Sequence, residues 1–153
     1  MSSQKMPSET RILGRDGPVV SAIGLGCGSL GGFYGAAGDL AQKVALLDHA
    51  HKIGLRFWDA ADVYGDVEDI IGEWIRRHPE KRKEVTIATK FGLKVKPDGR
   101  GHDFDSSPEY VREACEKSMK RLNTDYIDLY YCHRVDGKTP IEKTVEAMAE
   151  LKR

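Results

Sequence analysis

The sequence predicts an α/β fold in which a parallel sheet has helices outside it. Short apolar runs alternate four times with longer segments whose apolar residues recur at helical spacing. Proline, glycine and capping-box residues stand where these helical segments begin or end. The chain has 153 residues, of which 40% are hydrophobic and 31% charged, a composition typical of a globular domain with its own core.

The first elements are a polar tail and a hairpin. Residues 1–10 are polar and lack the apolar core of a secretory signal, so we expect a disordered N-terminal tail there. The pair Asp16-Gly17 separates two short apolar runs, at residues 11–14 and 18–21, which is a β-hairpin signal. The domain is therefore expected to cover residues 11–153.

Two strand-helix units follow the hairpin. The first has an expected strand at residues 22–26 and a helix at 39–53, with Asp39 as its N-cap. The second has a strand at 55–58 and a helix at 67–77, which the proline at position 79 closes. We expect the apolar stripe of each helix to face the sheet.

Two further units complete the pattern. The third has a strand at residues 85–89 and a helix that opens with the capping-box pair Ser106 and Glu109. The fourth has a strand at 126–132 and a helix that opens at 139–142, a second capping box with proline at the first helical position. Because crossovers between parallel strands are right-handed, the four units predict a parallel sheet with the helices outside it.

Four units make about half of a (β/α)8 TIM barrel, which typically has about 250 residues. The predicted fold class is thus α/β, with the chain covering an N-terminal β-hairpin plus the first four β/α units of such a barrel. The isolated half would leave its first and last strands with open edges. We therefore expect self-association through these exposed half-barrel edges.

Charge and cysteine content narrow the classes of partner. The 24 basic and 24 acidic residues give a net charge of zero, so no overall field favours nucleic acid or a membrane surface. No apolar run approaches the length of a membrane span. The cysteines Cys27, Cys115 and Cys132 are odd in number and lack metal-ligand spacing, which argues against a disulfide framework or a zinc site. We expect a cytoplasmic protein with small-molecule or protein partners.

Polar side chains follow three successive predicted strands. Asp59, Lys90 and His133 stand at these strand ends, and Tyr64 lies in the loop after Asp59. Catalytic groups of (β/α)8 barrels gather at this end of the sheet. A nearby ammonium favours the phenolate form of a tyrosine, and a carboxylate can hold the ammonium in place. The set suits proton transfer to a carbonyl, for which a cofactor must supply the reductant.

The residues around these positions resemble the N-terminal half of the aldo-keto reductases, an NADPH-dependent (β/α)8 family. Four segments carry the resemblance in the same order: residues 23–28 with 33–35, 57–65, 86–92 and 126–134. The resemblance implies that the protein is an oxidoreductase that reduces an aldehyde or ketone to an alcohol. Tyr64 would be the general acid, Asp59 and Lys90 would tune it, and His133 would orient the substrate carbonyl.

The resemblance also implies a cofactor site. NADPH would deliver the hydride, and Cys27, Gly28 and Asp59 would contact it; no metal is implied. Cys27-Gly28 replaces a threonine-aromatic pair found in many members. Most residues that bind the adenosine phosphate and pyrophosphate in the family belong to the four units that are absent. The isolated chain is therefore expected to lack reductase activity.

Two other functions remain open. One is a non-catalytic regulatory subunit of the same fold that binds a nicotinamide cofactor. The other is a metal-dependent barrel hydrolase that uses Asp59 and His133, which the missing H-x-H pair at the end of the first strand disfavours.

Three other patterns are given a structural interpretation. The G-x-G-x-x-G match at residues 26–31 does not open a helix directly, which disfavours a Rossmann site. The basic run at 76–83 is expected to be a solvated turn at the opposite face. Residues 94–104 are expected to form a long polar loop on the catalytic side.

Overall fold

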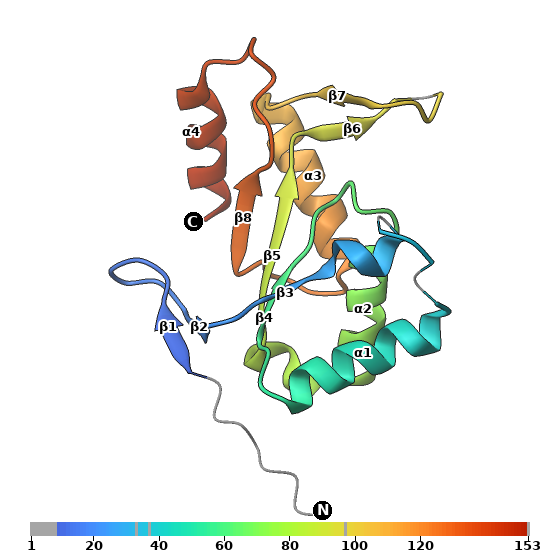
Figure 1. Ribbon diagram of the computed structural model, residues 1–153. Coiled ribbons are helices and arrows are strands. Elements are labelled where there is room, and N and C mark those ends of the chain that lie inside the picture. The colour runs from blue at the N-terminus through green and yellow to red at the C-terminus, as the bar shows by residue number, and fades with distance from the viewer. Residues whose placement is uncertain (1–8, 33, 37, 97, 153) are drawn as a thin grey trace, which may run out of the picture.

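The chain folds around a parallel sheet. The computed structural model describes residues 9–32, 34–36, 38–96 and 98–152. Four strands lie in the order β3 (Leu25–Gly26), β4 (Phe57–Asp59), β5 (Thr86–Phe91) and β8 (Leu129–Cys132). All three neighbouring pairs are parallel. Because each strand is added beside the one before it, the sheet has the order that successive βα units predict (Figure 1).

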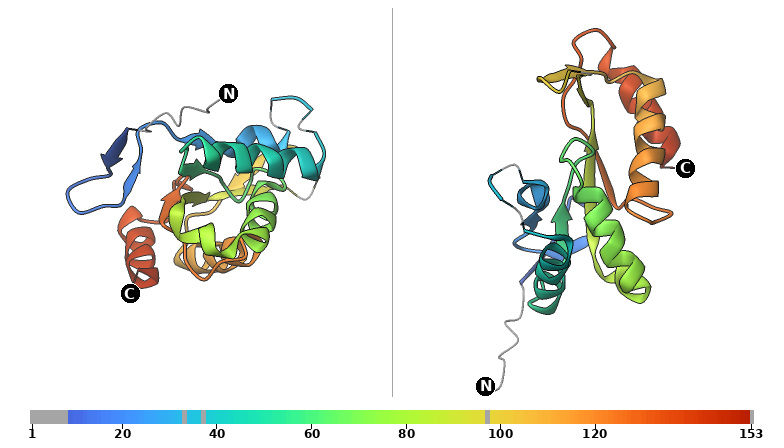
Figure 2. Two further views of the ribbon diagram at one scale, coloured as in Figure 1. Left: turned by 90° about the horizontal axis from the view of Figure 1, so that it is seen from below. Right: turned by 90° about the vertical axis from the view of Figure 1, so that its right-hand side faces the viewer.

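One helix follows each strand of the parallel sheet along the chain. The helices are α1 (Leu40–Lys52), α2 (Val67–Arg77), α3 (Pro108–Arg121) and α4 (Ile141–Leu151). Seen from below, they form an arc outside the strands, as the wall of a barrel would (Figure 2). None of the helices in the described part of the chain is long and apolar enough to cross a membrane.

The expected leading hairpin is present. Strands β1 (Thr10–Ile12) and β2 (Val19–Ser21) pair antiparallel. Of the expected disordered tail, residues 1–8 lie outside the described residues, whereas Thr10 already belongs to β1.

The expectation of a long polar loop at residues 94–104 is wrong. Most of this segment forms a second antiparallel hairpin, from β6 (Leu93–Val95) and β7 (His102–Phe104). Leu93 and Phe104 face each other across it, and such cross-strand apolar pairs stabilise a hairpin. The polar residues at its turn hid this pair from a composition-based interpretation.

Helix α1 begins as the sequence predicts. The Asp39 carboxylate accepts a hydrogen bond from the backbone N–H of Gln42 at 2.8 Å. The Gln42 side chain accepts one from the backbone N–H of Asp39 at 3.0 Å. This reciprocal pair is a complete capping box and satisfies N–H groups that the first helical turn leaves open.

Both predicted capping boxes are wrong. Ser107, not Ser106, caps α3 by accepting from the backbone N–H of Tyr110 at 3.3 Å, and α4 has no side-chain cap. Asp136 explains the difference. Its backbone N–H donates to the Ser106 hydroxyl at 3.2 Å, and its carboxylate accepts from the Thr139 hydroxyl at 2.8 Å. Both predicted caps are therefore bonded to Asp136 instead, and the Ser106 bond joins the loops before α3 and α4.

The core lies between the sheet and helices α1 and α2. Its largest side chains, Trp58 and Trp74, meet edge to face, with ring centroids 4.7 Å apart. Their indole N–H groups donate to the Leu55 carbonyl at 2.8 Å and to Asp48 at 2.9 Å. Each buried indole therefore contributes apolar area without leaving a polar group unpaired.

The basic run at residues 76–83 is only partly the solvated turn that we expect. Its second half forms the 3-10 helix η2 (Pro79–Glu84), in which Arg82 is buried. The Arg82 guanidinium donates to the Val85 and Tyr126 carbonyls and pairs with Asp128 at 2.8 Å. It thus ties the start of β5 to the segment that leads into β8.

Replacing this arginine should destabilise the sheet. Arg82→Met would remove the arginine from Asp128 and two carbonyls. Because Asp128 is partly exposed and keeps the Ile87 N–H, we expect a cost of about 1–3 kcal/mol. We expect a lower free energy of unfolding in urea for Arg82→Met. Lys83→Met, an exposed position in the same 3-10 helix, should stay close to the parent. Equal stabilities of the two variants would contradict this role of Arg82.

Candidate active site

The predicted polar side chains meet at one end of the sheet. Asp59 is the last residue of β4, Lys90 lies near the end of β5, and His133 follows β8. The parallel register places Asp59 beside Ala88 and Lys90 beside Tyr131. The strands therefore deliver the three side chains to the same edge, as strand order alone predicts.

The Lys90 ammonium lies at the centre of the group. It donates to the Asp59 carboxylate at 2.5 Å and to the Ala60 carbonyl at 2.7 Å. It also lies 4.9 Å from the centroid of the Tyr64 ring. The Lys90 side chain is 13% exposed, whereas that of Asp59 is 38% exposed. The ammonium is thus held by the protein, and the carboxylate faces the open mouth.

The His133 ring completes the group. It stands edge-on to the Tyr64 ring, with centroids 5.8 Å apart, and the His133 backbone N–H donates to the Phe91 carbonyl at 2.7 Å. Burial, and then the charge of Lys90, lower the pKa of His133 below its usual value. A neutral imidazole is therefore favoured. Its Nδ1 is buried without a hydrogen-bond partner in the described structure, as expected where a polar ligand group completes a site.

Two glycines of the loop after β3 fit closely against the Tyr64 segment. A Cβ added at Gly31, in the 3-10 helix η1 (Cys27–Gly31), would lie 2.3 Å from the Tyr64 carbonyl oxygen. A Cβ at Gly28 would already touch the Tyr64 ring at 3.7 Å. The position after Tyr64, Gly65, has a left-handed φ of +62°. Small residues thus allow the loop to bring the phenol over Lys90.

The predicted cofactor residues lie around this mouth, but only two offer an accessible surface. Gly28 and the Asp59 carboxylate are partly exposed. Cys27 is fully buried, and its thiol lies 3.5 Å from the Leu25 carbonyl. Burial, and then the charge of Asp59, raise the pKa of Cys27 to about 12, so the thiol stays neutral. Cys27 therefore offers a ligand neither its side chain nor its backbone in this structure.

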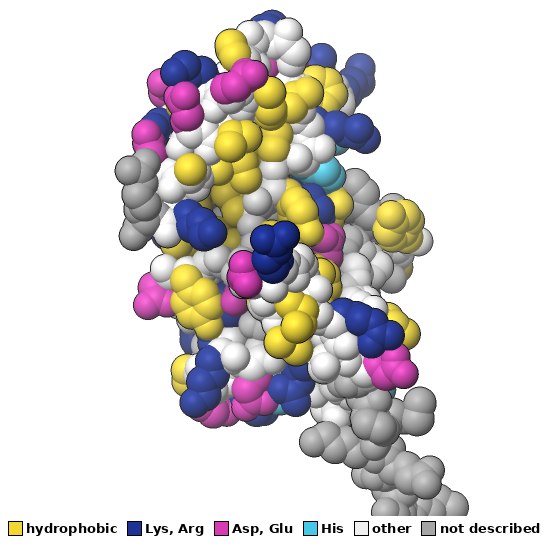
Figure 3. Space-filling model, turned by 90° about the vertical axis from the view of Figure 1, so that its left-hand side faces the viewer, with side chains coloured by type: hydrophobic (Ala, Val, Ile, Leu, Met, Phe, Trp, Pro, Cys, Tyr) yellow, Lys and Arg dark blue, Asp and Glu magenta, His cyan; other side chains and the backbone are white. Residues whose placement is uncertain are grey.

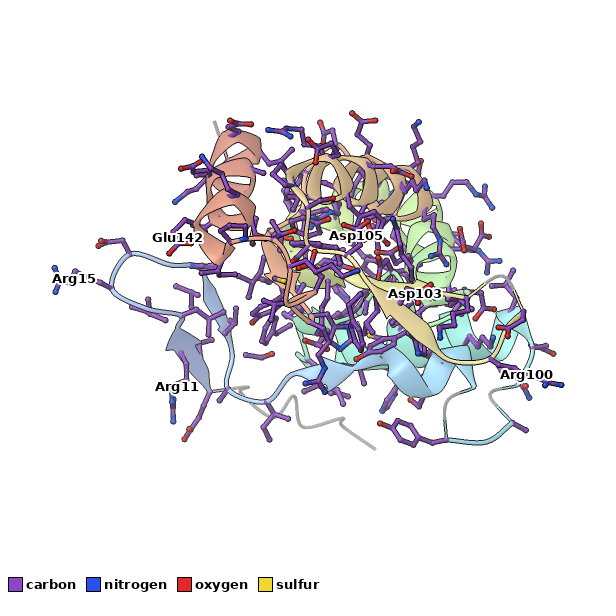
Figure 4. All side chains as sticks on the ribbon, turned by 90° about the horizontal axis from the view of Figure 1, so that it is seen from above. Arg11, Arg15, Arg100, Asp103, Asp105 and Glu142 are labelled. Atoms are coloured by element: carbon purple, nitrogen blue, oxygen red, sulfur yellow. The ribbon has the colours of Figure 1, made fainter. Side chains whose placement is uncertain are left out.

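The β6–β7 hairpin lies at the same end of the molecule as the four side chains. Figure 4, seen from above, shows Arg100 at the far tip of the hairpin and Asp105 at its base. Lys94 pairs with Asp105 at 2.5 Å and lies over the Tyr110 ring, which anchors the base to α3. Strand β6 begins at Leu93, just after the end of β5, the strand that carries Lys90. The hairpin therefore borders the site.

The described residues form no comparable group of metal-ligating side chains. Among the residues that the structure describes, no set of three or more His, Cys, Asp or Glu side chains is placed to hold a metal ion.

Beside the Tyr64 loop lies a buried network of charged residues that the sequence does not predict. Glu68 is fully buried and accepts a hydrogen bond from the Thr89 hydroxyl at 2.7 Å. Its other carboxylate oxygen lies 3.2 Å from the Arg121 guanidinium. Glu68 shares the inner face of α2 with Ile71 and Ile75, three and seven positions later. This spacing is the one feature of the sequence that indicates the burial of Glu68.

Asp62, in the same network, has an unusual environment for a carboxylate. The Tyr110 hydroxyl donates to one of its oxygens at 3.4 Å, and the other is buried without a partner in the described structure. Burial, and then the negative charge of Glu68, raise the pKa of Asp62 to about 7.

The fold and the site together define the N-terminal half of a (β/α)8-barrel protein with a lysine-centred group of polar residues at the barrel mouth. Residues 22–153 match the sequence profile of the Aldo/keto reductase family. The chain belongs to this family, as the resemblance of its four segments predicts.

Relatives and solved structures agree with this assignment. The aldo-keto reductase str7 of Strobilurus tenacellus is 47% identical over 95% of this chain and 42% of its own length. The aldo-keto reductase yakc [NADP(+)] of Schizosaccharomyces pombe is 42% identical over 94% of this chain and 42% of its own length. The holo form of an aldo-keto reductase from Bacillus halodurans matches 95% of this chain and 46% of its own, with 34% identity and a TM-score of 0.82. The chain thus spans less than half the length of each.

Asp62 should make the stability of the chain depend on pH. An aspartate in an unfolded chain has a pKa near ~3.9, so the folded state binds the Asp62 proton more tightly. Its stabilising contribution is present below about pH 4 and is lost as pH rises through 7. Between pH 4 and 8, Asp62→Asn should therefore gain about 2–4 kcal/mol in free energy of unfolding relative to the parent.

Urea unfolding at several pH values measures this difference. Asp125→Asn, at an exposed position, is the matched control and should show a constant difference from the parent. A flat profile for Asp62→Asn as well would show that Asp62 does not hold its proton in the folded chain.

Proposed function

We propose that this chain carries the acid-base residues of an NADPH-dependent oxidoreductase that reduces an aldehyde or ketone to an alcohol. The observation that supports this most directly is the Lys90 ammonium, which contacts Asp59 and lies against the Tyr64 ring. Membership of the aldo/keto reductase family and the NADP(+) in the name of the yakc relative support it further.

In this proposal Tyr64 donates the proton. As the carbonyl is reduced, negative charge develops on its oxygen, and the phenol transfers its proton to that oxygen. The Lys90 ammonium, 4.9 Å from the ring centroid, stabilises the phenolate that remains. Asp59 holds the ammonium in place. A neutral His133 can donate one hydrogen bond to the carbonyl oxygen without adding charge to the site.

Reduction also requires a hydride, which a bound reduced nicotinamide would supply to the carbonyl carbon. The site fits such a group in two respects. Asp59 presents a partly exposed carboxylate, an acceptor for sugar hydroxyl groups, and Gly28 leaves the space beside Tyr64 without a side chain. We propose contacts to Asp59 and Gly28, whereas the expected contact to Cys27 does not fit its full burial. The three free cysteines fit a reducing compartment such as the cytoplasm.

A fused barrel tests the proposal. It consists of this chain followed by the part of the Strobilurus tenacellus relative that lies beyond the matched segment. We expect NADPH oxidation with a generic aldehyde, and a kcat about 100- to 10,000-fold lower for Tyr64→Phe, because the general acid is lost. Tyr126→Phe, an exposed tyrosine at the other end of the sheet, is the control and should retain its kcat.

The isolated chain is the second arm of this experiment. We expect no turnover from it, because more than half of each relative lies outside the matched segment. Turnover at the rate of the fused barrel would contradict this expectation. A fused barrel that binds NADPH tightly but does not oxidise it would favour a non-catalytic regulatory subunit.

We further propose that the isolated chain self-associates. Strand β8 has no neighbour beyond β5 in the described sheet, and exposed apolar side chains lie around it on α4 and the β1–β2 hairpin. Figure 3 shows hydrophobic side chains gathered on this face. The exposed apolar residues of these elements are Ile12, Val19, Tyr131, Ile141, Val145 and Leu151. A second copy could cover them while pairing with the open strand edge.

Light scattering after size exclusion should show a mass above the monomer's 17.1 kDa that rises with concentration. Val145→Glu should shift the population towards monomer, because it places a charge in the apolar face. Val95→Glu, at a similarly exposed position on β6, should not. A monomeric parent, or equal effects of both changes, would exclude this surface.

A further inference from the structure

Arg121, in the last turn of α3, contacts the loop that carries Tyr64. Its Nη1 donates to the Asp62 carbonyl at 3.0 Å, and its Nη2 donates to the Gly65 carbonyl. These two carbonyls lie on either side of Val63 and Tyr64 in the chain. One guanidinium therefore binds the backbone on both sides of the segment that carries the Tyr64 phenol.

Two carboxylates of α2 hold the guanidinium in turn. Asp69 accepts from Arg121 Nε at 3.0 Å and from Nη2 at 2.7 Å. Glu68, which is fully buried, lies 3.2 Å from Nη1. The guanidinium is planar and has five N–H groups in fixed directions, so this set of partners determines its orientation as well as its position.

The same network reaches the strand that carries Lys90. Glu68 accepts from the hydroxyl of Thr89, the residue before Lys90, at 2.7 Å. The Asp62 backbone N–H donates to the Lys90 carbonyl at 3.1 Å. The phenol loop and the lysine strand are therefore linked through Glu68 and Arg121 as well as through the backbone.

The backbone hydrogen bonds of Tyr64 itself are local. Within the loop, the Tyr64 N–H donates to Ala61 and the Tyr64 carbonyl accepts from Val67, both local bonds of a turn. Gly65, with its left-handed φ, is a position with unusual backbone freedom. Proton transfer is sensitive to displacement, since a shift of about 1 Å can reduce a rate about 100-fold.

From these contacts we propose that Arg121 is a positioning residue for the reduction: by holding the Asp62 and Gly65 carbonyls, it keeps the Tyr64 phenol between Lys90 and His133. This inference rests on the function proposed above, because it concerns the general acid of that reaction. It assigns a role in the reaction to a charged residue outside the proposed acid-base group.

The most informative variant is Arg121→Lys in the fused barrel. Lysine keeps the positive charge beside Glu68 and Asp69, but its single ammonium cannot reproduce the fork to two carbonyls. We expect kcat to fall about 10- to 100-fold, with the KM for the aldehyde and the Kd for NADPH within about twofold of the parent. Arg112→Lys is the matched control, because Arg112 lies on the same helix and binds Pro108 and Glu150.

A double variant separates positioning from a purely structural role. If Arg121 acts through Tyr64, then Arg121→Lys should cause no further loss of the residual rate in a Tyr64→Phe background. If it only joins two helices, its effect should be the same in both backgrounds. Multiplied losses, or an unchanged kcat in the single variant, would overturn the inference.

An NMR measurement on the 153-residue chain and on the fused barrel does not depend on turnover. The ring protons of His133 report on the Tyr64 ring, because the two rings meet edge to face. Arg121→Lys should change these shifts, and Arg112→Lys should leave them as in the parent. Unchanged shifts for Arg121→Lys would overturn the inference. If the parent barrel has no reductase activity but the shifts change as expected, the proposed function fails and the positioning of Tyr64 by Arg121 stands.

Discussion

The contact between Lys90 and Asp59 is the constraint on which the site depends. A largely buried ammonium is stable only where oxygen atoms surround it, and here a carboxylate on the neighbouring strand and the Ala60 carbonyl provide them. This requires β4 and β5 to lie side by side in the observed register. With the ammonium fixed, the Tyr64 ring can pack against it and His133 can stand at the edge of that ring.

The sequence predicts the strand order, the helices and the four polar side chains, because these follow from periodicities and positions local to the chain. Local patterns fail where a distant residue competes. Ser106 has the spacing of a helix cap, but Asp136, which is distant in sequence, binds it in the fold. The hairpin at residues 93–104 was missed for a related reason, since the pair Leu93 and Phe104 is separated by a polar turn.

The network around Glu68 could not be found in the same way. An acidic residue in the first turn of a helix usually stabilises the helix dipole in solvent. The position of Glu68 in the apolar stripe of α2 indicates that its side chain points inward. Its partners Thr89 and Arg121, however, come from two other elements. Only the packing of α2 against α3 and β5 shows that this carboxylate is buried and paired. Sequence patterns therefore predict the side chains at the strand ends better than the groups that support them.

The proposed proton transfer and the proposed hydride transfer have different structural requirements. The phenol, the ammonium, the imidazole and the groups that hold them all lie within this chain, although the His133 Nδ1 has no hydrogen-bond partner among the described residues. The relatives, by contrast, are more than twice as long as the segment that they share with it. The proposed acid-base group can therefore be assembled by this chain, whereas the proposed cofactor site also involves the part of the relatives that lies beyond the matched segment. Geometry at the barrel mouth and turnover are separate properties, and the first does not imply the second.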